Sequence, residues 1–325
     1  IDMTGAGAAI VNAGIIKAEW GITVYNGTND SDPLLAKNAT DIVNTGKVAA
    51  SDHAIYADGV AVNLRNTGML NGIVSLGGGQ DVVSNRGGAI NGDVQLHEGD
   101  DVFKNRDGTI NGDVRLGFGD DRFEGRGGRL NGVLYGGDGN DVVTLASPAT
   151  LYVEQYDEGF DRVRINATYR LGAHIDGLTL LGKANHTGIG NSLSNWLIGN
   201  KGDNALFGLD GGDVLSGNDG RDRLDGGAGN DTLHGGTGKD SLTGGDGDDD
   251  FQFIKGDGRD TIADFIAGSD VIEISGFTGI VGFDDLDIDQ SGADAVIRFN
   301  DTDILVLTDT IGGNLVDTDF VFLLT

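Results

Sequence analysis

Apolar residues recur along this chain at fixed intervals, and the interval changes part-way. From 71 to 143 the sequence repeats every 20 residues. Each copy contains two short β-prone stretches separated by glycine-rich turns, and no 3.6-residue helical period runs through them. One apolar position is filled in successive copies by Val83, Phe103, Phe123 and Val143. A single coil cannot bury its apolar face, whereas stacked coils can, so the pattern predicts a parallel β-solenoid with one coil per copy.

A second period, of nine residues, runs from 190 to 252. Its pattern is Gly-Gly-x-Gly-x-Asp-x-Leu-x, and the first copies are degenerate. The eighth position is always Leu or Phe: Leu197, Leu206, Leu215, Leu224, Leu233, Leu242 and Phe251. Two nonapeptides supply one turn on each side, which predicts an 18-residue coil of a parallel β-roll.

These patterns predict an all-β fold, a parallel β-solenoid in four parts. We expect a β-helix over 1–143, with its 20-residue repeats starting at 71, and connecting strands over 144–189. A β-roll is expected over 190–262. The last part, 263–325, is expected to form a β-sandwich-like cap.

Composition narrows the classes of function. The chain has 58 Gly, 2 Pro and no Cys, and its 51 acidic and 22 basic residues give a net charge of −29. The lack of Cys excludes disulfides and zinc–thiolate sites, and no apolar run approaches the ~18 residues of a transmembrane span. The negative charge argues against nucleic acid as a partner. Because 45 of the acidic residues are Asp, many of them beside Gly, the composition points to tight turns and ligands for hard cations.

The nonapeptide turns carry the chemistry that suggests calcium. Each turn offers glycine carbonyl groups and an Asp carboxylate at its sixth position, and six to eight flexible oxygen ligands suit Ca²⁺ better than Mg²⁺. Parallel coils stack ~4.8 Å apart, so equivalent carboxylates in successive coils lie about that far from one another. At an effective dielectric constant of 20, two such charges repel by roughly 3 kcal/mol. The sequence therefore predicts several Ca²⁺ ions between the stacked turns.

The repeat register assigns the candidate ligands. The 18-residue coil places Asn204, Asp222 and Asp240 on one side and Asp213, Asp231 and Asp249 on the other. In the 20-residue array, the same reasoning predicts a one-sided ladder of Asp81, Asp101, Asp121 and Asp141. Third-position carboxylates and the acids just after the array complete the candidate set: Asp138, Asp210, Asp219, Asp246, Asp257 and Asp260. The alternative is that these turns simply require Gly and Asp for their shape.

Residues 199–252, with their in-phase Gly-Gly-x-Gly-x-Asp copies, resemble the repeats-in-toxin (RTX) family of hemolysin-type calcium-binding proteins. The resemblance implies a parallel β-roll with Ca²⁺ in both rows of turns, type I secretion, and an extracellular or cell-surface location on a bacterium. Residues 256–265, 291–297 and 319–322 resemble the C-terminal cap and secretion signal of serralysin-like RTX proteins. The 20-residue array resembles the family only through its calcium loops, since its second turn reads Asn-Arg-x-Gly-x-Ile.

Catalytic signatures of secreted enzymes are missing from the sequence. The five histidines form no HExxH motif, which excludes the usual zinc protease site. No GxSxG nucleophile elbow is present either. We therefore expect no enzymatic activity, although lyase or epimerase chemistry on a solenoid face stays open as an alternative.

The leading hypothesis is a secreted, non-catalytic structural scaffold that folds on Ca²⁺ outside the cell, such as a surface layer, an adhesin or an extracellular matrix filament. Such a scaffold would form a homo-oligomer or lattice. The alternative is the C-terminal calcium-binding and secretion module of a larger secreted enzyme, a protease, a lipase or a polysaccharide epimerase or lyase. In that case the catalytic part precedes Ile1.

An arginine row marks the turn opposite the aspartate ladder of the 20-residue array. It consists of Arg86, Arg106 and Arg126, which recur at the repeat interval. Stacked guanidinium groups require anionic or stacking partners. Pairing with the neighbouring Asp93, Asp107 and Asp113 or with solvent is one interpretation. Binding of an acidic polysaccharide or a lipopolysaccharide is the other.

Overall fold

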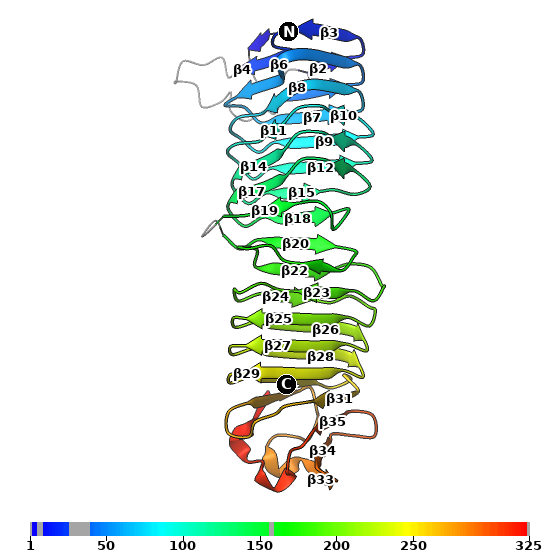
Figure 1. The fold of residues 1–325 in the computed structure, drawn as a ribbon, viewed down its shortest axis with the longest axis vertical. Helices are drawn as coiled ribbons and strands as arrows, with labels where there is room; N and C mark the ends of the chain where they lie inside the picture. The colour runs from blue at the N-terminus through cyan, green and yellow to red at the C-terminus, as the bar shows by residue number, and fades with distance from the viewer. Residues whose placement is uncertain (1, 5–8, 26–39, 156–158, 324–325) are drawn as a thin grey trace. The chain divides into compact units, whose positions relative to one another are not determined.

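The computed structural model describes residues 2–4, 9–25, 40–155 and 159–323. The chain forms a parallel β-solenoid, as the repeat periods predicted (Figure 1). Its coils divide into two compact units. Unit 1 comprises Ile1–Arg164 and Gly172–His174, and unit 2 comprises Ile165–Leu171 and Ile175–Thr325. The helices in the described ranges are three short 3₁₀ turns, η2 (Phe283–Asp285), η3 (Gly312–Asn314) and η4 (Asp317–Asp319).

Unit 1 is built from two parallel sheets, because each coil contributes one strand to each. The first sheet follows the order β1 (Asp2–Thr4), β4 (Ile22–Tyr25), β6 (Lys47–Asp58), β8 (Met69–Ser75), β11 (Val94–Gln95), β14 (Val114–Phe118), β17 (Leu134–Asp138) and β19 (Tyr152–Val153). Four short strands extend it: β3 (Ile15–Ala18), β10 (Ala89–Ile90), β13 (Thr109–Ile110) and β16 (Arg129–Leu130). The second sheet follows the order β2 (Ala9–Asn12), β5 (Thr40–Asn44), β7 (Val62–Asn66), β9 (Val82–Arg86), β12 (Val102–Arg106), β15 (Arg122–Glu124), β18 (Val142–Leu145) and β20 (Arg162–Ile165).

Alternation along each strand places the unit 1 core between its two sheets. Phe103 pairs in register with Val83 on one side and with Phe123 on the other, a separation of 20 residues in each case. All three side chains are buried, and the rings of Phe103 and Phe123 meet edge to face with centroids 5.5 Å apart. The stack predicted from the 20-residue period is therefore the core of this unit.

A row of buried asparagines closes one edge of unit 1. The side-chain amide of Asn12 donates to Oδ1 of Asn44, at 2.8 Å, and the same bond continues coil by coil. The remaining members of this amide row are Asn66, Asn85 and Asn105, joined by bonds of 2.8–3.0 Å. In β12 the row lies at the end of the strand, while Asp101 lies just before its start, so amides and carboxylates occupy opposite edges of the coil.

Unit 2 repeats the same principle with 18-residue coils. Its first sheet follows the order β22 (Gly177–Leu180), β24 (Trp196–Ile198), β26 (Val214–Gly220), β28 (Thr232–Gly238), β30 (Asp250–Ile254), β32 (Val271–Ser275) and β36 (Phe320–Leu323). Its second follows the order β21 (Tyr169–Arg170), β23 (Thr187–Ile189), β25 (Ala205–Asp210), β27 (Arg223–Ala228), β29 (Ser241–Asp246), β31 (Arg259–Ile262), β35 (Ile304–Leu307), β34 (Asp294–Arg298) and β33 (Asp287–Ser291). The eighth-position residues from Leu197 to Phe251 are buried and stack in register, for example Leu215 on Leu233.

The unit ends in a cap where the strand direction changes. β33, β34 and β35 are antiparallel, whereas β36 lies parallel to β32 with Phe320 opposite Ile272. Aromatic rings fill the space at the last coil, where Phe253 and Phe277 each stack on Phe299 with centroids 4.8 Å apart. The cap therefore covers the apolar end of the last coil, which a solenoid would otherwise expose.

Candidate calcium sites along the turns

A ladder of buried aspartates follows one edge of unit 1. The backbone N–H of Asp81 donates to Oδ1 of Asp101, 2.7 Å away. The same bond links Asp101 to Asp121 and Asp121 to Asp141, at 2.7 and 2.8 Å. Each of these residues is at most 2% exposed. The structure thus brings together the four residues that the 20-residue period placed in one ladder.

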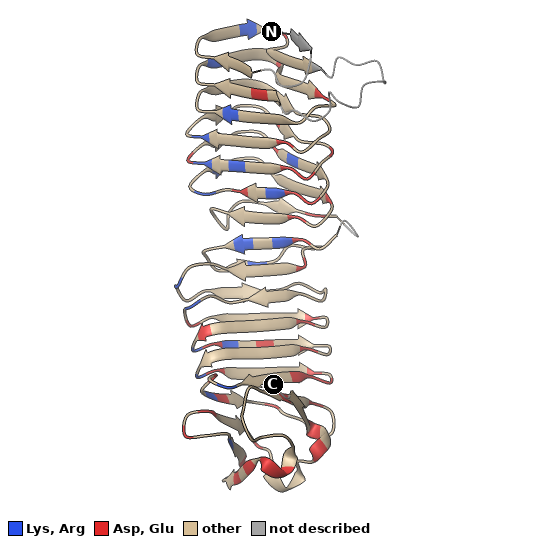
Figure 2. Ribbon diagram, turned by 180° about the vertical axis from the view of Figure 1, so that it is seen from behind, with Lys and Arg blue, Asp and Glu red and all other residues tan. Residues whose placement is uncertain are grey.

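Unit 2 carries one ladder at each edge. On the first edge, the N–H of Asn204 donates to Asp222, that of Asp222 to Asp240, and that of Asp240 to Asp260. On the second edge, Asp213 donates to Asp231 and Asp231 to Asp249. The two sides hold the residues that the 18-residue coil assigned to them, and acidic residues gather at the turns of these coils (Figure 2).

In seven of the ladder carboxylates, one oxygen accepts a hydrogen bond and the other does not. Oδ1 accepts the backbone hydrogen bond of the neighbouring coil, whereas Oδ2 is buried and has no hydrogen-bond partner. This holds for seven ladder residues: Asp81, Asp101, Asp121, Asp213, Asp222, Asp231 and Asp240. A buried, unsatisfied carboxylate oxygen is costly. A cation at each Oδ2 would remove that cost.

Oδ2 of these carboxylates packs closely against a glycine. A Cβ added at Gly208 would lie closer than 3.0 Å to Oδ2 of Asp213 and to the carbonyl oxygen of Gly226, one coil away. The same holds at Gly226, for Oδ2 of Asp231 and the carbonyl oxygen of Gly244. Carboxylate and carbonyl oxygens therefore converge on the glycine, at a distance that leaves no room for a side chain. An all-oxygen donor set of this kind suits Ca²⁺.

Burial changes the protonation of the ladder carboxylates. It raises the pKa of Asp101 to about 9 and that of Asp81 to about 8. In unit 2 it raises the pKa of Asp222 and Asp231 to about 7. A bound divalent cation favours the ionised form and works against this shift. Ionisation of the ladders at neutral pH is therefore coupled to cation binding.

The four predicted third-position ligands lie outside the ladders. Asp138, Asp210 and Asp246 are exposed at the third position of their turns. Asp219 accepts hydrogen bonds from Lys201 and Thr237, at 3.0 and 3.1 Å, and the Lys201 contact lowers its pKa. The structure does not bring these side chains into the ladders, so a role as a second carboxylate ligand stays a prediction.

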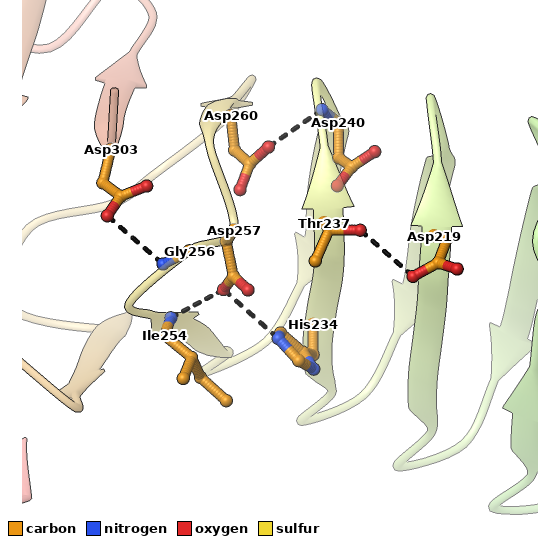
Figure 3. Close-up of polar contacts among 9 residues, drawn as sticks. All are labelled: Asp219, His234, Thr237, Asp240, Ile254, Gly256, Asp257, Asp260 and Asp303. Atoms are coloured by element: carbon orange, nitrogen blue, oxygen red, sulfur yellow. Dashed lines mark hydrogen bonds and ion pairs between the residues drawn. The ribbon is translucent and has the colours of Figure 1, made fainter. Parts of the chain in front are cut away.

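Asp257 and Asp260 have different surroundings (Figure 3). Asp260 extends the first ladder of unit 2, because its Oδ1 accepts the N–H of Asp240 at 2.9 Å. Oδ2 of Asp257 accepts the N–H of Ile254 at 2.6 Å and lies 3.2 Å from Nε2 of His234. Asp257 thus fixes the turn before the cap and does not join the ladder.

The structure adds four residues that sequence reasoning missed. Asn195 opens the second ladder of unit 2 and Asp270 closes it, through bonds to Asp213 and from Asp249. Asp161 closes the unit 1 ladder, since it accepts the N–H of Asp141. The spacing of 18 residues before Asp213 and 20 after Asp141 could have identified the first and third. Glu154, buried beside Asp141 and Asp161, falls in no repeat.

Three segments of the chain match the model of the RTX calcium-binding nonapeptide repeat. They are residues 130–146, 189–224 and 225–251, so the match includes one turn of the 20-residue array as well as the β-roll. The chain contains RTX repeats. RTX nonapeptide repeats bind calcium, and the several matched copies mean that the RTX-repeat chain binds several Ca²⁺ ions.

Two solved structures resemble the RTX-repeat chain. The extracellular lipase LipA from Serratia marcescens is 15% identical, with a TM-score of 0.29, over 88% of this chain and 45% of the lipase. The AlgE6R3 subunit of the mannuronan C5-epimerase from Azotobacter vinelandii is 24% identical, with a TM-score of 0.25, over 46% of this chain and 86% of that subunit. The chain thus spans less than half of the lipase, and TM-scores of this size establish nothing about activity. No curated protein matches it in sequence.

The arginine row has partners other than those that were expected. Asp93 and Asp113 lie within 3.7 and 3.3 Å of Arg115, not of the row. Arg106 pairs with Glu124, whose second carboxylate oxygen accepts from Arg122 at 3.0 Å. The expected pairing with Asp93 and Asp113 is therefore wrong.

In the part of the chain that the structure describes, no helix has the length and apolarity to cross a bilayer.

Proposed function

We propose that this RTX-repeat chain is a secreted, non-catalytic structural scaffold that folds when it meets Ca²⁺ outside the cell. The observation that supports the proposal is the set of buried Oδ2 atoms in the ladders, which have no hydrogen-bond partner. Without a cation, the folded state must keep these oxygens dry and unsatisfied. With a cation, the same oxygens become ligands.

Calcium concentration then acts as the folding switch. A site whose dissociation constant is 10 to 100 times below the ambient Ca²⁺ concentration contributes about 1.4–2.7 kcal/mol to stability. Several such sites outweigh the ~5–15 kcal/mol by which folded domains are usually stable. At the sub-micromolar Ca²⁺ of a cytosol, sites tuned to millimolar Ca²⁺ contribute almost nothing.

The proposal extends to export by a type I transporter that reads the C-terminus. A transporter that threads an unfolded chain requires cargo that stays unfolded inside the cell, and an ion-free ladder meets that need. The cap emerges first from such a transporter and provides a folded end on which the coils can stack. Binding free energy then becomes folding free energy outside the cell.

Assembly into a surface layer, an adhesin or a matrix filament is the scaffold role that we propose for the folded protein. Binding of an acidic polysaccharide or a lipopolysaccharide at the arginine row would anchor such an assembly. Electron microscopy with millimolar Ca²⁺ tests the assembly: ordered sheets or filaments support it. Dispersed single particles at high protein concentration count against it.

Chelation tests the calcium step directly. Circular dichroism of the purified chain should lose β signal when Ca²⁺ is removed, with the largest losses in amide protection over 190–252 by hydrogen exchange. A spectrum that does not change after exhaustive chelation contradicts the proposal. Assays against protein, ester and glycan substrates test the non-catalytic part, because reproducible turnover by the purified chain would favour the module of a secreted enzyme.

A further inference from the structure

An open hollow of about 530 Å³ lies on the outer face of the first sheet of unit 1. It lies where β6, β8 and β11 end, three strands that are neighbours in this sheet (Figure 1). The last residues of these strands, Asp58, Ser75 and Gln95, all line it. No ladder aspartate and no arginine of the row is among the described residues that line it. Its volume falls within the range of roughly 300–1,000 Å³ that is typical of ligand pockets.

Aromatic rings form one wall of the hollow. His53 and Tyr56 both line the space, and their rings meet edge to face with centroids 5.5 Å apart. Trp20 extends this wall, because its ring stacks on His53 at 4.7 Å and forms a T-shaped pair with Tyr56 at 5.2 Å. Trp20 is 39% exposed. The wall thus presents an indole surface that its neighbours cover only in part.

The backbone fixes the aromatic wall in place. The register between β6 and β8 shifts on both sides of His53, which is an irregularity of the β-bulge kind. Bulges re-aim side chains and are frequent next to functional sites. The backbone N–H of Gly21 donates to the carbonyl oxygen of His53 at 2.8 Å, so the turn that carries Trp20 is tied to this irregularity.

The hollow also contains a histidine in an unfavourable backbone conformation. His97 has a φ of 71°, a left-handed value that favours glycine, and the other copies of the repeat carry Gly77, Gly117 and Gly137 at this position. Its Nε2 lies 2.9 Å from Oγ of Ser75, one coil away. Strained residues of this kind cluster at ligand sites. The Ser75–His97 pair adds hydrogen-bonding groups to the hollow that holds the aromatic wall.

The lining residues indicate the class of ligand. Of the described residues that line the hollow, none is Lys or Arg, and the exposed acids Asp58 and Glu98 disfavour an anionic ligand. Ala57 is the sole aliphatic residue among them, so a lipid or an apolar peptide finds little apolar surface. A sugar ring suits this lining, because its C–H groups pack on the negative face of an aromatic ring and its hydroxyl groups pair with carboxylate, amide and imidazole groups.

We propose that this hollow binds a neutral glycan chain. Sugar rings pack against Trp20 and Tyr56, and sugar hydroxyl groups donate to the carboxylates of Asp58 and Glu98. The site goes beyond the proposed scaffold function, because it gives the protein a ligand other than calcium. It is also separate from the arginine row, which begins on β9 and β12 of the second sheet.

Titration with defined glycans tests the ligand class. The full chain is kept in saturating Ca²⁺, so that any calcium-dependent folding is complete. The probes are neutral hexasaccharides of glucose, mannose, galactose, xylose and N-acetylglucosamine, with a hexamer of galacturonate as the anionic probe. At least one neutral probe should bind in isothermal titration, and the galacturonate hexamer should bind at least tenfold more weakly. Binding of the anionic probe alone, or of no probe, would overturn the proposal.

The two tryptophans provide a matched pair of variants. Trp20→Ala removes the exposed indole from the wall and should weaken binding of the neutral glycan at least tenfold. Trp196→Ala is the control, since Trp196 is 48% exposed and belongs to β24 of unit 2, and it should bind like the parent. Equal affinity of Trp20→Ala and the parent would contradict the site.

Fluorescence gives a second measurement on the folded chain. The sequence contains two tryptophans, so Trp196→Phe leaves Trp20 as the sole source of tryptophan emission. This emission should shift to shorter wavelengths as the neutral glycan is added, because a sugar ring displaces water from the indole. An emission spectrum that stays the same at saturating glycan would place the ligand elsewhere.

His97→Gly separates binding from folding. It restores the residue that the other copies carry at this φ, so it should not lower the melting temperature, yet it should weaken glycan binding at least fivefold. A histidine with a merely structural role would give a lower melting temperature and unchanged binding, and that result would overturn its assignment to the site. The calcium proposal is tested apart from this one: a chain that loses its β signal on chelation but binds no neutral glycan refutes only the glycan site.

Discussion

The backbone N–H of Asp213 donates a hydrogen bond to Oδ1 of Asp231, 2.7 Å away and 18 residues along the chain. That bond fixes the carboxylate so that Oδ2 lies against Gly226. The same residue thus registers two coils through one oxygen and leaves the other without a hydrogen bond, as a candidate cation ligand. A substitution that removes the hydrogen bond to Oδ1 should therefore have a different effect from one that removes only the charge at Oδ2.

The charge of Asp231 should matter only when Ca²⁺ is present. Asp231 lies mid-ladder between Asp213 and Asp249, so Asp231→Asn weakens the ion sites on both sides while keeping an oxygen for the backbone bond. A tenfold loss at each of two sites corresponds to about 3 kcal/mol in saturating Ca²⁺. Thermal melts should show this loss with Ca²⁺ and none without it. Asp287→Asn, on an exposed strand of the cap, is the control and should melt like the parent in both conditions.

Gly226 should not tolerate a methyl group. Gly226→Ala places a Cβ against Oδ2 of Asp231 and the carbonyl oxygen of Gly244, so it pushes both candidate ligand oxygens out of position. We expect at least tenfold weaker calcium binding and a loss of about 1–3 kcal/mol from overpacking. Gly282→Ala is the control, because a Cβ there meets no atom within 4 Å. Parent-like titration of Gly226→Ala would show that these two oxygens hold no ion.

Stability of the metal-free protein should fall as pH rises. Burial raises the pKa of Asp222 and Asp231 to about 7 and of Asp260 to about 8, above the value of about 3.9 in an unfolded chain. A raised pKa stabilises the folded state below the unfolded value, and this contribution is lost as pH passes through the folded value. Metal-free melting temperatures should therefore drop between pH 5 and 8.

Saturating Ca²⁺ should reverse that dependence, because ionised carboxylates bind the cation and protonated ones do not. Asp231→Asn should give a shallower slope in metal-free buffer, since one titrating group is missing. A metal-free melting temperature that is equal at pH 5 and pH 8 would contradict the coupling between burial and ionisation.

Export should depend on the C-terminal strand. Deletion of 320–325 removes β36, whose Phe320 and Phe322 pair with Ile272 and Ile274, while Leu324 and Thr325 lie outside the described residues. We expect the truncated chain to remain in cells that express a type I transporter and to miss the medium. Refolding of the purified truncated chain in Ca²⁺ is the control for folding. Equal amounts of truncated and parent chain in the medium would place the signal elsewhere.

Periodic features were predictable from the sequence, and their interruptions were not. The stack of Leu215 on Leu233 and the split of the β-roll carboxylates between two edges follow from a strict 18-residue coil. Asp270 follows Asp249 by 21 residues, and that extra length hides it from a fixed period. Glu154 directly follows β19, and no sequence repeat predicts the pairing of this short strand with β17.

Local charge was a poor guide to pairing. Asp93 and Asp113 lie near the arginine row in sequence, yet they point to Arg115, because alternation along β11 and β14 decides which face a side chain reaches. The buried amide row was also hidden, since its members are 32, 22, 19 and 20 residues apart. Irregular loops between coils change the spacing along the chain without changing the stacking.

The amide row gives unit 1 one edge whose hydrogen bonds do not depend on a bound cation. An asparagine side chain carries both a donor and an acceptor, so Asn44, Asn66 and Asn85 satisfy one another without help. An ionised carboxylate carries only acceptors, so the opposite edge requires a bound cation. Unit 1 is therefore held at one edge by hydrogen bonds that do not depend on Ca²⁺ and at the other edge by a calcium-dependent ladder. Both edges of the β-roll are calcium-dependent ladders. A falling Ca²⁺ concentration should therefore unfold the β-roll first and unit 1 later, because unit 1 keeps the hydrogen bonds of its amide row.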